Sequence, residues 1–250
     1  MQLGKKIRSI MGEPLKELGF EYRKGDVSCI YEFIRPEDGY EERIGIQRGA
    51  YGQYLFVRLG FTIRGSLPSD LCDFSGVTCP MNFKYTEENI DSVLQEITVL
   101  LLQHINRCFE GYKPIKTPPL RWYERLEREM NKLYDSFAAR YRFSKDINTC
   151  IEQVMRLILE QSGTVEENED FVLGAAAFCG EHIRIRGKSK WIWEEHEMPQ
   201  PYENFKTYVV QQGAYMEFDI NPLWYIIRYW CQPMVKDSDL SIWFLKRGRY

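Results

Sequence analysis

The chain has 250 residues, of which 44% are hydrophobic and 28% are charged, and its formal net charge is −3. That balance excludes a largely disordered chain and provides enough apolar residues for one large or two ordinary domains. The sequence has no basic stripe, so nucleic acid is not an expected partner. It has no apolar run long enough to cross a bilayer, and residues 1–19 are too charged for a signal peptide. Seven irregularly spaced cysteines are typical of reduced thiols, so we expect a cytoplasmic protein with no membrane partner.

The first half of the chain predicts a sheet flanked by two helices. Apolar residues recur every three or four positions over residues 3–18, and Gly19 is a natural helix stop. Four segments rich in aromatic and β-branched residues follow, at 20–23, 27–35, 40–47 and 53–64, and turn signals separate them. Residues 65–83 read as a long connection with little regular structure, and residues 86–109 as a second helix. We therefore expect a first domain at residues 1–112 built on an antiparallel meander.

The best linker in the sequence is residues 113–120. Pro114, Pro118 and Pro119 lie within six residues and favour extended, polyproline-like chain over helix or sheet. The sequence predicts a stiff spacer between two domains here.

The second half, residues 121–250, predicts a mainly helical domain with a small antiparallel sheet. Helical patterns cover residues 121–142, 146–161 and 167–183, and Asn221 with Pro222 starts a short helix through residue 230. Strands are expected at 191–194 and at 240–245, and residues 208–219 are expected to form either two strand pieces or one strand with a bulge at Gly213. The expected fold class is therefore α+β with two domains.

Charges of both signs alternate along the predicted helix at residues 121–142. Opposite charges three or four residues apart are typical of a solvated helix face, and the alternative is a helix that binds a partner.

The best metal candidates are Cys72 and Cys79 in the long loop with His104 and Cys108, which are four residues apart on one helix. Zinc favours four cysteine or histidine ligands in tetrahedral geometry. The gap between Cys72 and Cys79 is wider than a usual zinc knuckle, so the favoured interpretation is ordinary buried or surface residues without a bound metal or cofactor.

A second polar cluster contains Glu181 and His182, followed by Glu195 and His196 beside further glutamates at positions 194 and 197. Such residues can supply an acid, a base or a carboxylate-rich metal site. Their spacing matches no zinc-protease motif, and a polar rim on a strand edge is the favoured alternative. The sequence also has no nucleophile elbow and no phosphate-binding glycine loop, so a non-catalytic protein is the favoured interpretation and an enzyme stays an open alternative.

Two segments resemble known bacterial families. The helix end at residues 14–20, followed by the strand segments at 31–33, 46–48 and 55–60, resembles a family of uncharacterised bacterial domains. In the second half, residues 173–181 with Trp191, Trp193 and residues 221–223 resemble an uncharacterised module found near toxin-immunity and secretion loci. Neither resemblance implies a catalytic residue.

The leading functional hypothesis is a bacterial, non-catalytic protein-interaction factor, such as an immunity or accessory protein, whose partner is another protein. Two alternatives remain open. One is a hydrolase or other enzyme, either zinc-dependent or without a metal. The other is a sensor that binds a small molecule in an aromatic-lined pocket of the second domain.

Overall fold

The computed structural model describes residues 3–24, 29–50, 53–62, 68–196, 205–211 and 219–246. The chain divides into two compact units. Unit 1 is Met1–Pro114 with Met234–Lys236, and unit 2 is Ile115–Pro233 with Asp237–Tyr250. Helices and antiparallel strands are both present, so the α+β prediction is confirmed.

Unit 1 is built on an antiparallel sheet of consecutive strands. The order is β1-β2-β3-β4-β5, and β6 pairs with β4. In the centre of the sheet, Ile44 lies opposite Phe33 on one side and Leu59 on the other. The strands are β1 (Glu21–Lys24), β2 (Ile30–Glu37), β3 (Tyr40–Arg48), β4 (Tyr54–Phe61), β5 (Ser69–Asp70) and β6 (Phe83–Lys84).

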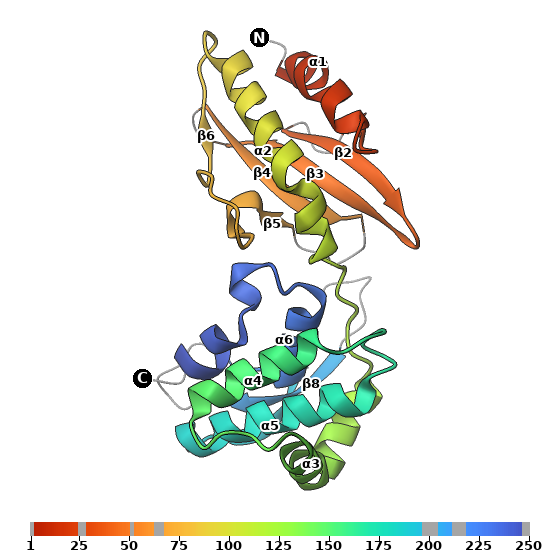
Figure 1. The fold of residues 1–250 in the computed structure, drawn as a ribbon, viewed down its shortest axis with the longest axis vertical. Helices are drawn as coiled ribbons and strands as arrows, with labels where there is room; N and C mark the ends of the chain where they lie inside the picture. Colours follow the sequence, from red (N-terminus) through yellow and green to blue (C-terminus); the bar gives the residue numbers. More distant parts are fainter. Residues whose placement is uncertain are drawn as a thin grey trace. The chain divides into compact units, whose positions relative to one another are not determined.

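Two helices, α1 (Leu3–Lys16) and α2 (Ile90–Glu110), cover the same face of this sheet (Figure 1). Ile7 and Met11 of α1 and Ile97 of α2 are fully buried, because the periodicity of three and four places them on the faces that meet the strands. Gly19 has a φ of 85° after α1, which is the left-handed conformation that ends a helix.

The opposite sheet face carries charges that neutralise one another. This agrees with alternating side chains in β4, which put apolar residues on the helix side and polar residues on the other. The ion pairs are Arg23 with Glu41 at 2.8 Å, Arg43 with Glu32 at 3.2 Å, and Arg58 with Asp70 at 2.9 Å.

The predicted connection at residues 65–83 has more structure than expected. Its described part forms β5, a short 3₁₀ turn at Leu71–Asp73 and β6, because Leu71 and Phe74 are apolar anchors buried in the core of unit 1. Phe74 also forms a β-bridge with Val235, and the backbone N–H of Ser75 donates to the carbonyl of Met234 at 2.7 Å. A segment from the end of the chain is therefore part of unit 1.

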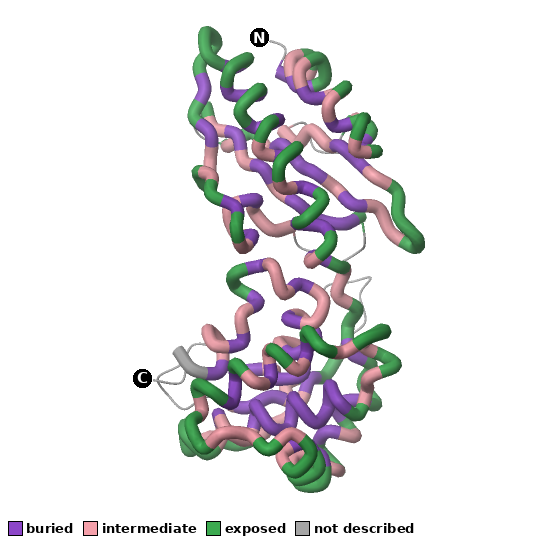
Figure 2. Tube along the Cα trace, viewed as in Figure 1, coloured by how far each residue is buried: buried purple, intermediate pink, exposed green. Residues whose placement is uncertain are grey.

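In its described part, unit 2 packs four α-helices with a two-stranded antiparallel sheet. Its helix α5 is buried along most of its length (Figure 2), and small residues such as Gly174, Ala175 and Ala176 allow its neighbours to approach closely. The elements are α3 (Leu120–Tyr141), α4 (Ile147–Leu159), α5 (Glu169–Gly187), β7 (Lys190–His196), β8 (Phe205–Gln211) and α6 (Pro222–Cys231).

One described segment of this half differs from the sequence prediction. Residues 240–245 were expected to be a strand, but Ile242–Lys246 is a π-helical turn. The buried residues Leu240 and Phe244 are four apart, which is a helical spacing, and Asp239 Oδ1 accepts a hydrogen bond from the backbone N–H of Ser241. The bulge predicted at Gly213 lies outside the described residues.

Candidate functional site

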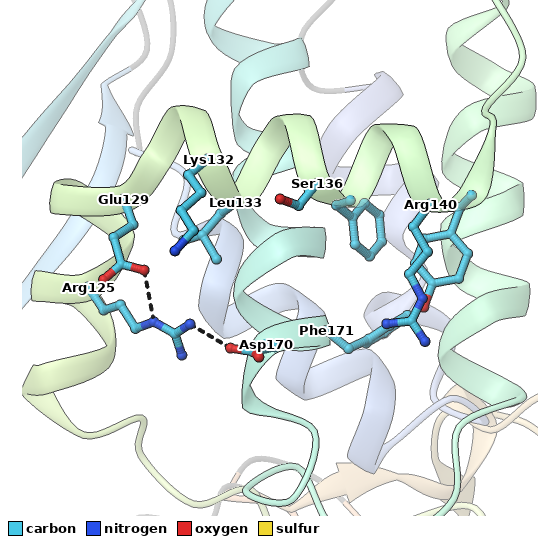
Figure 3. Close-up of a pocket in the computed structure, with 10 residues that line it drawn as sticks. Arg125, Glu129, Lys132, Leu133, Ser136, Arg140, Asp170 and Phe171 are labelled. Atoms are coloured by element: carbon cyan, nitrogen blue, oxygen red, sulfur yellow. Dashed lines mark hydrogen bonds and ion pairs between the residues drawn. The ribbon is translucent and has the colours of Figure 1, made fainter.

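A surface pocket of about 250 Å³ lies in unit 2 between the exposed side of α3 and the start of α5. Figure 3 shows the α3 residues in a row along the helix, with Asp170 and Phe171 of α5 opposite them. The lining residues fall into three kinds: the cations Arg125, Lys132 and Arg140, the polar or acidic Ser136, Glu129 and Asp170, and the apolar or aromatic Leu133, Phe137, Tyr141 and Phe171.

Helical periodicity explains why α3 contributes so many of these side chains. Arg125, Glu129, Lys132, Ser136 and Arg140 are three or four residues apart, so they form one stripe along the helix surface. Leu133 and Phe137 are slightly turned from that stripe toward the core and are buried. The pocket therefore has charged walls above an apolar floor.

Arg125 is the centre of an ion-pair network at one end of the pocket. Its guanidinium donates to Glu169 at 2.7 Å, to Asp170 at 2.5 Å and to Glu129 at 3.3 Å. Hydrogen bonds to Glu169 and then Asp170 raise the pKa of Arg125. The hydrogen bond from Arg128 lowers the pKa of Glu129 most, burial opposes it, and Arg125 lowers it further. The charge of Arg125 is thus balanced by carboxylates of the protein itself.

Lys132 and Arg140 differ from Arg125 in their surroundings. Both are exposed, and they flank Ser136 on the α3 stripe at a distance of four residues on each side. Arg140 lies over the Tyr141 ring at 5.2 Å, and within the described residues neither cation forms an ion pair with a carboxylate. These two charges are available to a ligand.

The floor of the pocket is a rigid aromatic cluster. Phe137 lies 5.4 Å from Phe171 and 4.9 Å from Tyr141, measured between ring centroids. Phe137 can sit this deep because Gly174 opposite it has no side chain: a Cβ there would lie 2.8 Å from the Phe137 ring. The floor is therefore preformed before any ligand arrives.

The structure gives Glu181 and His182 structural contacts. Glu181 accepts a hydrogen bond from the Trp191 indole at 2.6 Å and pairs with Arg184 at 2.8 Å. The His182 ring packs edge-on against Phe178 at 4.5 Å, and burial followed by the nearby Arg186 charge lowers its pKa. Neighbouring side chains of unit 2 thus hold both residues.

Glu195 and His196 are adjacent on β7, so their side chains point to opposite faces of the strand. Glu195 pairs with Lys206 at 2.6 Å, which lowers its pKa, and the His196 ring nitrogen lies 2.8 Å from the Thr207 hydroxyl. The His196 ring also stacks on Phe205. Glu195 and His196 therefore lie on opposite faces of β7 and do not form one polar cluster.

The four zinc candidates do not assemble a metal site. Cys72 lies in the 3₁₀ turn, Cys79 follows it, and Cys108 is buried on α2, where burial raises its pKa to about 11. Beside the larger effect of burial, Cys72 raises the pKa of Cys79, and Cys79 raises that of Cys108, so these three thiols act on one another electrostatically. The described residues, including His104, nevertheless contain no group of three or more potential ligands that could hold a metal ion. The buried face of α2 explains this, because it is filled by aliphatic side chains.

Sequence reasoning treated the α3 stripe as a solvated face and missed the pocket. The available signal was the distribution of acids, because three of the four acids of α3 lie in its first half, and Asp135 is the one acid in the second half with Lys132 and Arg140. Comparison of the chain with family models, curated proteins and solved structures finds no match. Among the described residues, no helix is both long and apolar enough to span a membrane.

Proposed function

We propose that this chain is a non-catalytic, cytoplasmic protein-interaction factor of the immunity or accessory type, and that it binds another protein through the α3 pocket. The observation that carries this proposal is the pairing pattern on α3. Arg125 is neutralised by three carboxylates, whereas Lys132 and Arg140 flank an aromatic floor without ion pairs among the described residues. Unpaired cations beside a preformed apolar pocket suit an anchor from a protein partner.

The size of the pocket supports a protein partner. Sites that enclose a whole small molecule usually measure roughly 300–1,000 Å³. The α3 pocket measures about 250 Å³ and opens at the surface, so it suits one inserted side chain better than a complete ligand. Aromatic residues at its floor provide the buried centre that such an anchor needs.

A second candidate function is binding of a small molecule as a sensor. Phe137, Tyr141 and Phe171 form one aromatic surface of this pocket, which a flat ligand could cover. Stabilisation of unit 2 by a metabolite at its saturating concentration would favour the sensor. A catalytic role has less support, because Glu181, His182, Glu195 and His196 each have a structural partner.

Site-specific photo-crosslinking tests the interaction surface. The photoreactive residue p-benzoylphenylalanine would replace Ser136 in the pocket or, as a control, Lys190 near the opposite end of α5. Irradiation in a lysate of the source organism should join one specific protein to the Ser136 variant and not to the Lys190 variant. Equal capture at both positions, or none at Ser136, would overturn the proposal.

A further inference from the structure

The spacing of the free charges on α3 restricts what the pocket can bind. Lys132 and Arg140 are eight residues apart, which corresponds to about 12 Å along a helix that rises 1.5 Å per residue. The apolar floor of Phe137 and Phe171 lies between them, at the foot of the same wall. A matching ligand therefore needs two anionic groups about 12 Å apart with an apolar group between them.

An extended peptide has this spacing. Alternate side chains of an extended strand point the same way, and residues i and i+4 are about 13 Å apart at 3.3 Å per residue. Acidic residues at i and i+4 would meet Lys132 and Arg140, while an apolar side chain at i+2 would reach the floor. A lone phosphate or carboxylate is too short to meet both cations in their separate positions.

We propose that the α3 pocket binds an extended acidic segment of a partner protein with the pattern acid-x-apolar-x-acid. The inference rests on the proposed function and names the chemistry of the partner. Lys132 and Arg140 each pair with one carboxylate, the Ser136 hydroxyl donates to the peptide between them, and the apolar side chain contacts Phe137 and Phe171. The Arg125 network closes the end of the pocket, because Glu129 and Asp170 would repel an acid placed there.

Nucleic acid fits this surface less well than an acidic peptide. Tracking a phosphate backbone needs a continuous basic groove. Next to the unpaired cations on α3 lies the Arg125 network, in which Arg121, Arg125 and Arg128 are neutralised by Glu129, Glu169 and Asp170. The basic groove is therefore interrupted at that end, which favours a short segment with two acids.

Fluorescence polarisation with a synthetic peptide tests the inference on the full chain. The probe is fluorescein-Gly-Ser-Asp-Ser-Phe-Ser-Asp-Ser-Gly-amide, and we expect a Kd of about 100 μM or lower. Lys132→Gln and Arg140→Gln should each weaken binding roughly threefold to fivefold, the range of a single exposed ion pair. Lys190→Gln removes the same charge far from the pocket and should leave the Kd within about twofold.

Three altered peptides give the matched controls: lysine in place of both aspartates, serine in place of phenylalanine, and the two aspartates placed directly beside the phenylalanine. Each should bind at least about tenfold more weakly than the probe, which corresponds to about 1.4 kcal/mol. Absence of binding at about 1 mM, equal binding of the lysine peptide, or no effect of the α3 substitutions would overturn the inference. Tighter, Lys132-dependent binding of a single-stranded oligonucleotide would also overturn it.

The outcomes separate this inference from the proposed function. If Ser136 captures a specific partner but the peptide does not bind, the interaction surface stands and the acid-x-apolar-x-acid pattern is wrong. If the peptide binds as expected but crosslinking fails at Ser136, the peptide chemistry stands and the proposed role in partner binding falls.

Discussion

Phe137 packs directly against Gly174, where a Cβ atom would lie 2.8 Å from the phenylalanine Cδ2 and 3.1 Å from its Cβ. The contact joins α3 to α5, and because Phe137 is also part of the pocket floor, the packing of the core fixes the shape of the binding surface. Any group added at Gly174 must push Phe137 toward the pocket.

Gly174→Ala should therefore destabilise unit 2 by about 1–3 kcal/mol, the usual range for overpacking. All six tryptophans lie in unit 2, so tryptophan fluorescence during urea denaturation reports on this unit. The control is Gly12→Ala in α1, where the nearest atom to a new Cβ is 4.0 Å away and helix propensity favours alanine. Unchanged tryptophan unfolding in the Gly174 variant would contradict the packing described here.

His182→Phe should remove a pH-dependent part of the stability of unit 2. Burial lowers the pKa of His182 in the folded state, whereas the unfolded chain titrates near 6.5. The unfolded state therefore binds the proton more readily, and the wild-type chain loses stability as the pH falls from about 6.5 through the lowered native pKa. The phenylalanine variant keeps the ring contact with Phe178 without this loss.

Urea denaturation at several pH values between about 7 and 5 checks the His182 prediction through the tryptophan signal. The difference in unfolding free energy between His182→Phe and wild type should grow as the pH falls. His104→Gln removes a histidine of α2, which belongs to unit 1, and should leave the tryptophan-detected pH dependence of unit 2 unchanged. A pH-independent difference for His182→Phe would show that the histidine is not held neutral.

Glu42→Gln should destabilise unit 1. Glu42 is only 2% exposed and bonds Arg35 at 2.5 Å, while Arg35 also donates to the Leu18 carbonyl and to Asn106. Those other acceptors keep Arg35 partly satisfied in the variant, so we expect a loss of about 1–3 kcal/mol at pH 7. Urea denaturation followed by circular dichroism measures it.

The same substitution should also show a defined pH dependence. Burial raises the pKa of Glu42 above its ordinary 4.5, outweighing the hydrogen bond from Arg35. The folded state therefore binds the proton more readily than the unfolded chain, so the wild type gains stability relative to Glu42→Gln as the pH falls through the native pKa toward 4.5. A wild-type advantage that shrinks over this range would contradict the raised pKa.

Val235→Ala should loosen unit 1, although residue 235 follows most of unit 2 in the chain. Val235 is buried in the core of unit 1 and bridges Phe74, so removing two methyl groups should cost about 1–3 kcal/mol. Hydrogen exchange measured by mass spectrometry should become faster in β4 and α2 and stay unchanged in α5. Faster exchange confined to α5 would contradict this prediction, because it would place Val235 in unit 2.

Local patterns were sufficient to predict most helices and the main strands. The stripe Leu3, Ile7, Met11 and Leu15 is complete within one segment, and the Asn221 side chain caps α6 by accepting from the Trp224 N–H at 3.0 Å. Residues 240–245 were predicted as a strand because aromatic and β-branched residues outweighed the four-residue spacing of Leu240 and Phe244.

The pocket depends on contacts that local patterns do not contain. Whether a cation of α3 is paired is decided by Glu169 and Asp170, which reach Arg125 from more than forty residues away in the sequence. Their approach leaves Lys132 and Arg140 without a carboxylate among the described residues. Periodicity identified the stripe, but only the packing of α5 shows which of its charges are free.

The placement of Met234–Lys236 in unit 1 means that neither unit is one continuous stretch of chain. A protease that cut once after Pro114 would produce fragments 1–114 and 115–250, and the second fragment would still carry Val235 in the core of the first. The hydrogen bonds of Met234 and Lys236 to Ser75 and Cys72 would survive such a cut. The nicked protein should therefore co-purify as one species and separate only under denaturing conditions.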